Sequence, residues 1–452
     1  MLQLIDDWRT HDPSVEILVV TRSPTGFLQP ELDRRQIPWM MLQFESWVLP
    51  KLIVEPEDVY RTARHDFVAV KALIRLIRES QPDVVVTNTI VAPWAAVAAK
   101  IVGVPHVWFP REFGDDHEFS VGVDSTFEDI GLLSDLVVTN SRTLADYLSR
   151  WVSDDKITVL YPFPDLSNLG ERAHEQVDGW RSPFSGDTTA LRVVCVGRIA
   201  ESKGQTRLIR AVARLKASGI RIEAALVGNS SGPEGQRVES LVRELDVDDR
   251  VFLTGELTNP FLVIEAADVG VVVSDSEGFG RVTVEYMASG KPVVAARAGA
   301  TVELVADGET GLLFEPGDED ALVEALRCYW NDRELIATHG TAARASVFSD
   351  IAERYPLSRV LDRIEATVAE GSAPVARMPH LVLSWMSLPR TAQQMFANAG
   401  ALANPASSAT WRVGNLVAKP LRFGTRLGKQ IGTRLGRVPR QIGRRVLKRR
   451  SA

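Results

Sequence analysis

The chain has 452 residues, of which 45% are hydrophobic, and it carries a net charge of -6 at neutral pH. This length allows two folded domains with large cores. The two cysteines, Cys195 and Cys328, are too few for a disulfide-stabilised module, and we interpret both as buried thiols in a reducing compartment. The first residues lack the basic start and apolar stretch of a signal peptide, and no run of about 20 apolar residues could span a membrane. We therefore expect a cytoplasmic protein.

The first region, residues 1–164, alternates strand-like with helix-like segments. Such alternation is typical of a parallel sheet that is covered by helices on both faces. The sequence therefore predicts an α/β domain here. Strands are predicted over 15–20, 39–44, 83–87, 106–109, 136–139 and 157–161, and helices over 69–79 and 92–101.

Residues 165–188 are polar, contain glycine and proline, and are predicted to form a linker. The second region, residues 189–346, repeats the strand and helix pattern and predicts a second doubly wound domain. Residues 347–371 are predicted as a closing helix, and residues 372–452 as a basic tail. The predicted strands of the second domain are 191–197, 222–228, 250–254, 269–273 and 293–296.

The loop after the first strand of the second domain carries two cations, Arg198 and Lys203, just before a helix. Arginine offers a bidentate fork to phosphate oxygens, and lysine offers a point charge. Gly197 lets the chain turn at the end of the strand. Taken alone, this pattern is also typical of a solvated turn, so its interpretation as a phosphate site depends on a second motif further along the chain.

The second motif runs from Glu277 to Tyr286. It follows another predicted apolar strand and leads into a predicted helix. Two carboxylates, Glu277 and Glu285, flank a turn that contains Gly278 and Gly280. In open α/β sheets ligands bind beyond the carboxyl ends of the strands, and helix N-termini attract anions. Carboxylates bind hydroxyl groups, so the two motifs together predict a site for a nucleotide or a nucleotide sugar.

This part of the chain resembles the retaining, nucleotide-sugar-dependent glycosyltransferases of family 4, which have the two-domain GT-B fold. The resemblance covers about residues 190–330, and it is weaker in the first half of the chain. It is carried by Val196-Gly197-Arg198, Lys203-Gly204, Leu226-Val227-Gly228, Ala266-Ala267-Asp268, Glu277-Gly278-Phe279-Gly280 with Glu285, Met287–Val294 and Asp307–Leu313.

The resemblance implies two Rossmann-like domains that face a cleft, and it assigns roles to residues of the second domain. We expect Arg198, Lys203 and Glu277 to be catalytic, with Glu277 beside the transferred sugar rather than acting as a nucleophile. Glu285 would hold the ribose hydroxyls, although an acid at this place could simply stabilise the helix dipole. The expected donor-binding residues are Gly197, Gly278, Phe279, Gly280, Arg281, Val282, Thr283 and Glu285.

The first domain departs from the family pattern at its start. The family begins with a strand, a glycine-rich loop and a helix, whereas this chain begins at what we interpret as that first helix, with Leu4, Ile5 and Trp8 on its apolar face. The missing strand would be central, and an open central slot would leave backbone groups unpaired. We expect either that the true start lies upstream or that another element fills the slot.

The segment after the strand predicted over 106–109 is expected to line the cleft of the first domain. Its candidate residues are Arg111, Glu112 and His117. The resemblance implies a histidine near the donor sugar in this region. His117 could equally be a surface histidine in a polar loop.

No metal or cofactor is expected. The chain has no Cys and His cluster with the spacing of metal ligands. It also has no aspartate-x-aspartate motif in a suitable loop, and we interpret the pairs Asp115-Asp116 and Asp248-Asp249 as turn residues. By resemblance, side chains rather than a metal ion would stabilise the leaving diphosphate.

The C-terminal tail is strongly basic, because fifteen residues from Gly371 to Ala452 are Lys or Arg and none is Asp or Glu. Apolar residues recur there at every third or fourth position, so we predict an amphipathic helix that binds an anionic membrane surface through residues 421–450. Five glycines and Pro439 oppose a free helix, so a disordered tail is the alternative. Nucleic acid is disfavoured as a partner, because few aromatic side chains could stack on bases. The apolar series is Phe423, Leu427, Ile431, Leu435, Val438, Ile442 and Val446.

We therefore predict a retaining, metal-independent glycosyltransferase. It would move a sugar from a nucleotide diphosphate sugar to a glycan or lipid-linked acceptor at the cytoplasmic face of a membrane. Two alternatives remain open. One is a catalytically silent nucleotide-sugar-binding scaffold, and the other is a nucleotide-sugar epimerase or hydrolase of the same fold.

Overall fold

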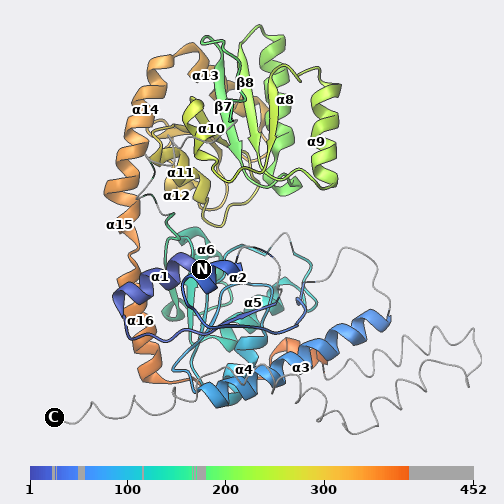
Figure 1. Ribbon diagram of the computed structural model, residues 1–452, viewed down its shortest axis with the longest axis vertical. Coiled ribbons are helices and arrows are strands. Elements are labelled where there is room, and N and C mark those ends of the chain that lie inside the picture. Colours follow the sequence, from blue (N-terminus) through green and yellow to red (C-terminus); the bar gives the residue numbers. More distant parts are fainter. Residues whose placement is uncertain are drawn as a thin grey trace, which may run out of the picture.

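The computed structural model describes residues 1–385 except 23–25, 27, 49–55, 115–116, 165, 167–168 and 170–179, and it gives only the backbone of residues 56–63. The described chain forms two α/β domains, one above the other in Figure 1. The predicted two-domain architecture is therefore confirmed. Both ends of the described chain lie in the lower, N-terminal domain.

The C-terminal domain is built on one six-stranded parallel sheet with the order β12-β11-β10-β7-β8-β9. Its first strand, β7, is therefore internal, and β10 lies directly beside it. Each strand is mainly apolar, as strands buried on both faces of a parallel sheet require. The strands are β7 (Leu191–Val196), β8 (Ile222–Val227), β9 (Val251–Gly255), β10 (Val269–Val272), β11 (Val293–Ala296) and β12 (Gly311–Phe314).

The sequence predicts five of these six strands and misses β12. This strand lies at the edge of the sheet, where it pairs only with β11. It has four residues, and its two inner residues are only partly buried. Neither an apolar run of useful length nor a clear alternation marks such a strand.

Helices cover both faces of this sheet. Val193 of β7 belongs to a core with α8, α9 and α13, whereas the next residue, Val194, belongs to a core with α10, α11 and α14. The change of face follows from the two-residue period of a strand. The helices are η2 (Glu201–Lys203), α8 (Gln205–Ala217), α9 (Pro233–Glu244), α10 (Phe261–Ala266), α11 (Arg281–Ala288), α12 (Thr301–Leu304), α13 (Glu319–Asn331) and α14 (Arg333–Ser346).

The N-terminal domain has two separate parallel sheets. One contains β1 and β2, and the other has the order β3-β4-β5-β6. In the described part of the chain no strand joins β1 to β3, and Val86 in the middle of β3 is 38% exposed. This division lies where an open central slot is expected without the family's first strand, and no described strand fills it. The strands are β1 (Val19–Thr21), β2 (Trp39–Met41), β3 (Val85–Thr87), β4 (His106–Trp108), β5 (Leu136–Thr139) and β6 (Ile157–Val159).

Helices pack on both faces of the four-stranded sheet. Trp108 of β4 lies in a core with α3, α4 and α5, and the preceding residue, Val107, lies in a second core on the other face. The helix predicted from residue 69 in fact begins at Pro56. The helices are α1 (Leu2–His11), α2 (Leu28–Arg34), α3 (Pro56–Ser80), α4 (Trp94–Val102), α5 (Val123–Leu133), α6 (Arg142–Leu148) and η1 (Asp154–Lys156).

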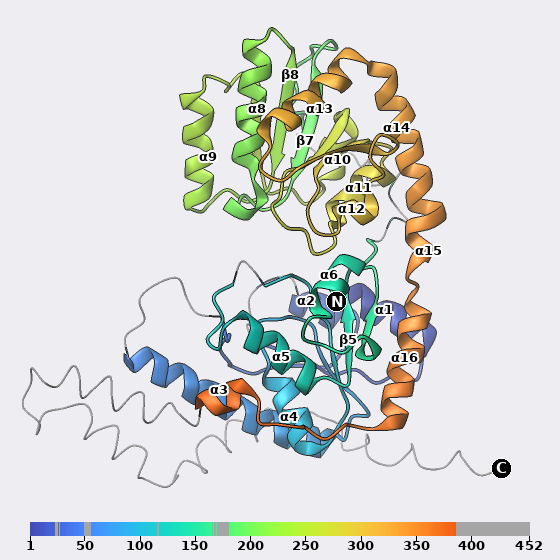
Figure 2. The same cartoon turned by 180° about the vertical axis from the view of Figure 1, so that it is seen from behind.

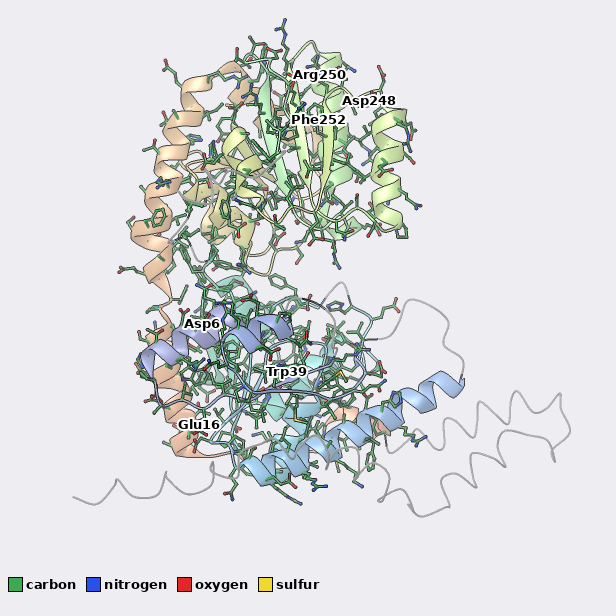
Figure 3. The ribbon with its side chains drawn as sticks, in the orientation of Figure 1. Asp6, Glu16, Trp39, Asp248, Arg250 and Phe252 are labelled. Atoms are coloured by element: carbon green, nitrogen blue, oxygen red, sulfur yellow. The ribbon has the colours of Figure 1, made fainter. Side chains whose placement is uncertain are left out.

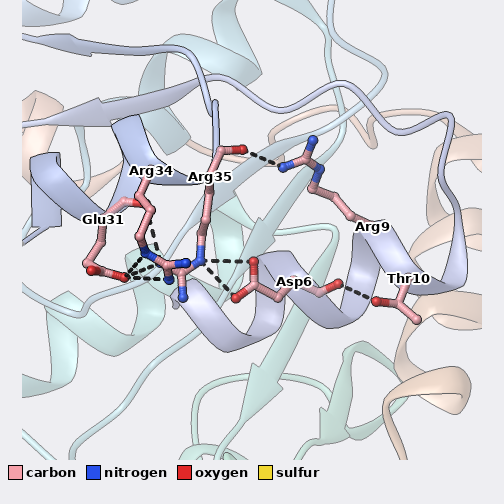
Figure 4. Close-up of polar contacts among 6 residues, drawn as sticks. All are labelled: Asp6, Arg9, Thr10, Glu31, Arg34 and Arg35. Atoms are coloured by element: carbon pink, nitrogen blue, oxygen red, sulfur yellow. Dashed lines mark hydrogen bonds and ion pairs between the residues drawn. The ribbon is translucent and has the colours of Figure 1, made fainter.

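Helix α1 is held to α2 by a small polar network (Figure 4). Arg35 lies at its centre: its Nε is 2.8 Å from Asp6 Oδ2, and its guanidinium also pairs with Glu31. Arg9 donates to the backbone carbonyl of Arg35 at 2.9 Å. Ile5 is buried in one small core, and Leu4 and Trp8 pack on a second core. The predicted apolar face of α1 is therefore confirmed.

The chain returns from the C-terminal domain to the N-terminal domain along one side of the molecule (Figures 1 and 2). Helix α14 passes without a break into the π-helical turn η3 (Val347–Ile351) and then α15 (Ala352–Arg354). Pro356 separates this run from α16 (Leu357–Glu370). Val360, Leu361 and Ile364 of α16 are buried against β4 and β5, so α16 forms part of the N-terminal core.

Residues 372–385, which the sequence assigns to the tail, instead pack on the N-terminal domain. The backbone N–H of Ala373 donates to Asp135 at 2.9 Å, and that of Leu381 donates to Asp129 at 2.8 Å. The Trp385 ring stacks on Trp94 with 5.2 Å between centroids. The structure thus corrects the start of the tail. The predicted membrane-binding segment 421–450 lies outside the described residues.

Asp66 of α3 is a buried carboxyl, 3% exposed, that accepts the backbone N–H of Glu45 at 2.8 Å. Burial, together with the nearby Glu45 charge, raises the pKa of Asp66 to about 7. An unfolded aspartate has a pKa of about 3.9. The folded state therefore holds a proton that the unfolded state has released between these two pH values, and the free energy of unfolding falls as pH rises through this window.

We predict that Asp66→Asn removes most of this pH dependence while keeping an oxygen for the Glu45 N–H. Between pH 5 and pH 8 the wild type should lose about 2–3 kcal/mol more of its unfolding free energy than the variant. Urea unfolding at a series of pH values measures the difference. Asp83→Asn, at an exposed aspartate of the same domain, is the control. Parallel pH profiles for all three proteins would show that Asp66 is not the source.

Candidate active site

A cleft of about 1820 Å³ lies between the two domains. The C-terminal domain lines it with the segments that follow β7 and β10, and the N-terminal domain lines it with α1 and the segments after β3, β4 and β5. Apart from α1, these segments lie at the carboxyl ends of parallel strands, where ligands bind in open α/β sheets. The cleft brings together the predicted catalytic residues and the three predicted cleft residues of the first domain.

Lys203 and Glu277 form an ion pair in this cleft, with 2.6 Å between Nζ and Oε1. They lie 74 residues apart in the sequence, and they meet because β7 and β10 are adjacent strands. The Glu277 side chain is 12% exposed and that of Lys203 is 33% exposed. The pair is therefore partly shielded from water but open to a ligand.

Gly204 allows the Lys203 loop to lie against the end of β10. Its φ is +66°, and a Cβ at this position would be 2.3 Å from the Val273 carbonyl oxygen. Any other residue would force the loop away from the strand. Glycine here therefore fixes the distance at which Lys203 approaches Glu277.

Arg198 lines the same cleft, and its side chain is exposed. Among the described residues its guanidinium makes no hydrogen bond or ion pair, but its backbone is held by Gln205, whose Nε2 donates to the Arg198 carbonyl at 3.0 Å. Gln205 is 2% exposed. The loop is thus fixed, while the charged group of Arg198 stays available to a ligand.

Tyr286 connects the two motifs through a buried hydrogen bond. This residue of α11 is fully buried, and its hydroxyl accepts the backbone N–H of Val196, at the end of β7, at 2.7 Å. The ring lies over β10, because a Cβ at Gly270 would be only 2.2 Å from it. Gly270 therefore makes room for the side chain that connects the second motif to the strand of the first.

The turn before α11 approaches the cleft mainly through its backbone. Gly280 has φ +83° and precedes the first residue of the helix, Arg281, whose side chain is exposed. Gly278, Gly280, Arg281 and Val282 line the cleft, whereas Thr283 and Glu285 do not. The Thr283 Oγ1 is buried without a hydrogen-bond partner. The predicted ribose contact of Glu285 stays a prediction.

Phe279 lines the cleft, and its contact with the donor stays a prediction. Its side chain is 3% exposed, belongs to the core of the C-terminal domain, and lies 4.9 Å from the Tyr161 ring between centroids. It therefore anchors the turn against the segment that follows β6, and the ring itself is largely withdrawn from solvent.

On the opposite wall Arg111 is held by Asn88, whose Oδ1 accepts from Nε at 2.8 Å and from Nη2 at 2.6 Å. Burial lowers the pKa of Arg111 to about 10. His117 lies 3.3 Å from the carboxylate of Glu112. Arg111, Glu112 and His117 all line the cleft, and their contact with a substrate stays a prediction.

At Gly278, in the turn before α11, the two domains approach each other closely. A Cβ there would be 2.3 Å from the Arg111 carbonyl oxygen. The same carbonyl accepts from Asn140 Nδ2 at 2.9 Å, and the Asn140 Oδ1 is buried without a partner. The absence of a side chain at Gly278 therefore sets the spacing of the domains at the site.

Three further residues that the sequence does not single out line the cleft: Asn88, Asn140 and Tyr161. A signal for them exists: each comes directly after a strand of the first domain or two residues beyond its end. Carboxyl ends of parallel strands meet at one edge of a sheet. Polar or aromatic residues at those positions could therefore have been proposed for the cleft.

The structure places Asp248 and Asp249 in a turn before β9, as predicted, and Asp249 pairs with Lys216 at 2.8 Å. Asp248 lies at the far end of the upper domain from the cleft (Figure 3), and Asp115 and Asp116 lie outside the described residues. In the part of the chain that the structure describes, no three His, Cys, Asp or Glu residues gather as a metal site would need. No helix in that part is long and apolar enough to cross a bilayer.

The chain matches known proteins over both domains. The family model described as Glycosyltransferase Family 4 matches residues 11–168, and the model described as Glycosyl transferases group 1 matches residues 180–346. Crystal structures of HepE from Anabaena, solved with UDP and with UDP-glucose, have the same fold. The UDP complex gives a TM-score of 0.62 at 22% identity and covers 82% of this chain and 96% of that one.

Two curated relatives match about half of this chain. The chain spans a little more than half of the length of each. The D-inositol 3-phosphate glycosyltransferase of Corynebacterium efficiens is 33% identical over 54% of this chain and 59% of that protein. The N-acetylgalactosamine-N,N'-diacetylbacillosaminyl-diphospho-undecaprenol 4-alpha-N-acetylgalactosaminyltransferase of Campylobacter jejuni is 30% identical over 48% of this chain and 57% of that protein. With both domains matched and the two motifs meeting in one cleft, the chain belongs to the family 4 glycosyltransferases of GT-B fold.

Proposed function

We propose that this protein is a glycosyltransferase that moves a sugar from a nucleotide diphosphate sugar to a glycan or lipid-linked acceptor, with retention of anomeric configuration. The observation that carries the proposal is the Lys203–Glu277 ion pair, which lies with Arg198 in a cleft between two Rossmann-like domains. The cations proposed for the phosphates and the carboxylate proposed for the sugar thus line one cleft.

Arg198 and Lys203 would stabilise the diphosphate as its bond to the sugar breaks. Lysine has three donors, so Lys203 can keep its bond to Glu277 and still donate to a phosphate oxygen. Arg198 has no competing partner among the described residues and can offer its whole fork. Charge-assisted donors of this kind act most strongly where charge develops in the transition state.

Glu277 would bind hydroxyl groups of the transferred sugar. Its contact with Lys203 holds the carboxylate in place and partly neutralises it, which makes it a poor nucleophile. We therefore assign Glu277 to the donor sugar and propose no covalent intermediate. By the family resemblance Glu285, which does not line the cleft in this structure, would hold the ribose, and the backbone of the turn from Gly278 to Val282 would face the phosphates.

The N-terminal domain would supply the acceptor side through Arg111, Glu112 and His117. The Campylobacter relative is named for a diphospho-undecaprenol acceptor, and HepE was solved with UDP-glucose. UDP-sugars and lipid-linked glycans are therefore the first substrates to try. We propose that the enzyme works at the cytoplasmic face of a membrane, held there by the basic tail.

A silent nucleotide-sugar-binding scaffold is the second candidate. The division of the N-terminal sheet between β1 and β3 favours it, since a cleft wall built on two unjoined sheets is less well supported. An epimerase or hydrolase of the same fold would need the donor but no acceptor. Donor binding and product formation, measured separately, distinguish these activities from transfer.

We predict that Arg198→Ala and Lys203→Ala each lower the rate of transfer about 10²–10³-fold while the fold survives. Thermal shifts of the wild type with UDP-, GDP-, ADP- and dTDP-sugars identify the donor first, because a ligand stabilises the state that binds it. The Lys203→Ala variant should lose that shift. Lys216→Ala, at a surface ion pair of the same domain, is the matched control.

Wild-type turnover in either cleft variant would contradict this assignment of the cations. Donor binding without transfer to any acceptor would favour the scaffold. Release of free sugar, or formation of an epimer, in the absence of an acceptor would favour the other enzymes of this fold.

We predict that transfer persists in EDTA, because Arg198 and Lys203 supply the positive charge at the diphosphate. Initial rates are measured after dialysis against EDTA and again after Mg²⁺ or Mn²⁺ is added. Loss of transfer on chelation, with recovery on addition of either metal, would show that the leaving group depends on a metal ion.

We predict that removal of residues 386–452 abolishes co-sedimentation with anionic vesicles, because this segment carries the basic and apolar residues of the predicted helix. The truncation keeps residues 372–385, which belong to the N-terminal domain. Neutral vesicles provide the control. A truncated protein that sediments as well as the full chain would rule out the tail as the anchor.

A further inference from the structure

Glu303, on the short helix α12 of the C-terminal domain, reaches across to the N-terminal domain. Its Oε1 accepts the backbone N–H of Thr143 at 2.6 Å, and its Oε2 accepts that of Arg142 at 2.9 Å. The Tyr161 hydroxyl donates to Oε2 at 2.6 Å, and the Thr143 hydroxyl also donates to Oε1. All four of these donors belong to the other domain.

The N–H groups that Glu303 accepts have no partner within their own helix. Arg142 and Thr143 are the first two residues of α6, and the first N–H groups of a helix lack intrahelical acceptors. The side chain of the capping residue Ser141 accepts from Leu144 instead. Burial and the bond to Glu303 raise the pKa of Tyr161, which keeps its hydroxyl protonated as a donor. The carboxylate therefore meets a set of donors that the helix itself leaves unsatisfied.

The segment that carries Glu303 also holds the backbone of Glu277. The Ala300 N–H donates to the Glu277 carbonyl at 2.8 Å. A Cβ at Gly299 would be 2.1 Å from the same oxygen, so the two segments are in direct contact. Tyr161, which Glu303 binds, lies against Phe279 in the same turn. One short segment thus connects the donor carboxylate to the opposite domain.

We propose that Glu303 is a positioning residue. It fixes the N-terminal domain against the turn that carries Glu277 and Phe279, and so sets the geometry of the cleft. Glu303 does not line the cleft and acts only through the residues that it holds. The contact of Gly278 with the Arg111 carbonyl would then form only when Glu303 accepts the α6 N–H groups. The catalytic consequence rests on the proposed transferase function, whereas the effect on domain spacing does not.

The first experiment measures domain spacing by small-angle X-ray scattering of the full chain. Glu303→Ala is compared with Glu309→Ala, an exposed glutamate in the turn that follows α12. We expect a larger radius of gyration for Glu303→Ala alone, because the acceptor of the α6 N–H groups is lost. Identical scattering of both variants and the wild type would overturn the proposal.

The second experiment separates positioning from a purely structural effect by comparing kcat with donor affinity. The proposed donor site lies mainly in the C-terminal domain, so the donor Kd in Glu303→Ala should stay within about twofold of the wild type. We expect kcat to fall at least tenfold, since a displacement of about 1 Å can cost on the order of 100-fold in rate. A Kd that weakens as much as kcat falls would overturn the positioning role.

Single-donor variants test the individual contacts. Tyr161→Phe and Thr143→Val each remove one hydroxyl, and each should give part of the effect of Glu303→Ala. Combined with Glu303→Ala they should add nothing further, because contacts that share one group are not additive. Fully additive losses would show that these residues act independently of Glu303. Should the wild type transfer no sugar at all, the scattering comparison still decides whether Glu303 sets the domain spacing.

Discussion

The site depends on the meeting of β7 and β10 as neighbouring strands of one parallel sheet. Their carboxyl ends bring Lys203 to 2.6 Å from Glu277 although 74 residues separate them. Two glycines make this approach possible, Gly204 against the end of β10 and Gly270 beneath the Tyr286 ring. If the two strands were not adjacent, Lys203 and Glu277 would lie in separate loops and could not form one site.

The cleft is defined by backbone contacts between the domains as much as by charged side chains. Gly278 lies against the Arg111 carbonyl, and Glu303 accepts N–H groups from α6. Carbonyls and backbone N–H groups move only with their domain. Contacts of this kind therefore fix the relative placement of whole domains, whereas flexible surface ion pairs such as Arg214–Asp320 fix very little.

The sequence predicted the strands that bear the site, because buried parallel strands are apolar runs with polar residues at their ends. It also predicted which loops meet, since that follows from parallel order and a resemblance that covers the second domain. It could not predict that Phe279 faces the core, because the partner ring, Tyr161, comes from the other domain. It could not predict Glu303 or the docking of residues 372–385 for the same reason: their partners lie 142 or more residues away, and no local pattern marks them.

Residues from both ends of the described chain complete the N-terminal domain. Val360, Leu361 and Ile364 of α16 close one of its cores, and Leu381 enters another. A ribosome that synthesises this chain releases the whole C-terminal domain before these residues emerge. The domain made first therefore finishes its core last, and nascent chains halted before α16 would expose the uncovered face of β4 and β5 to chaperones.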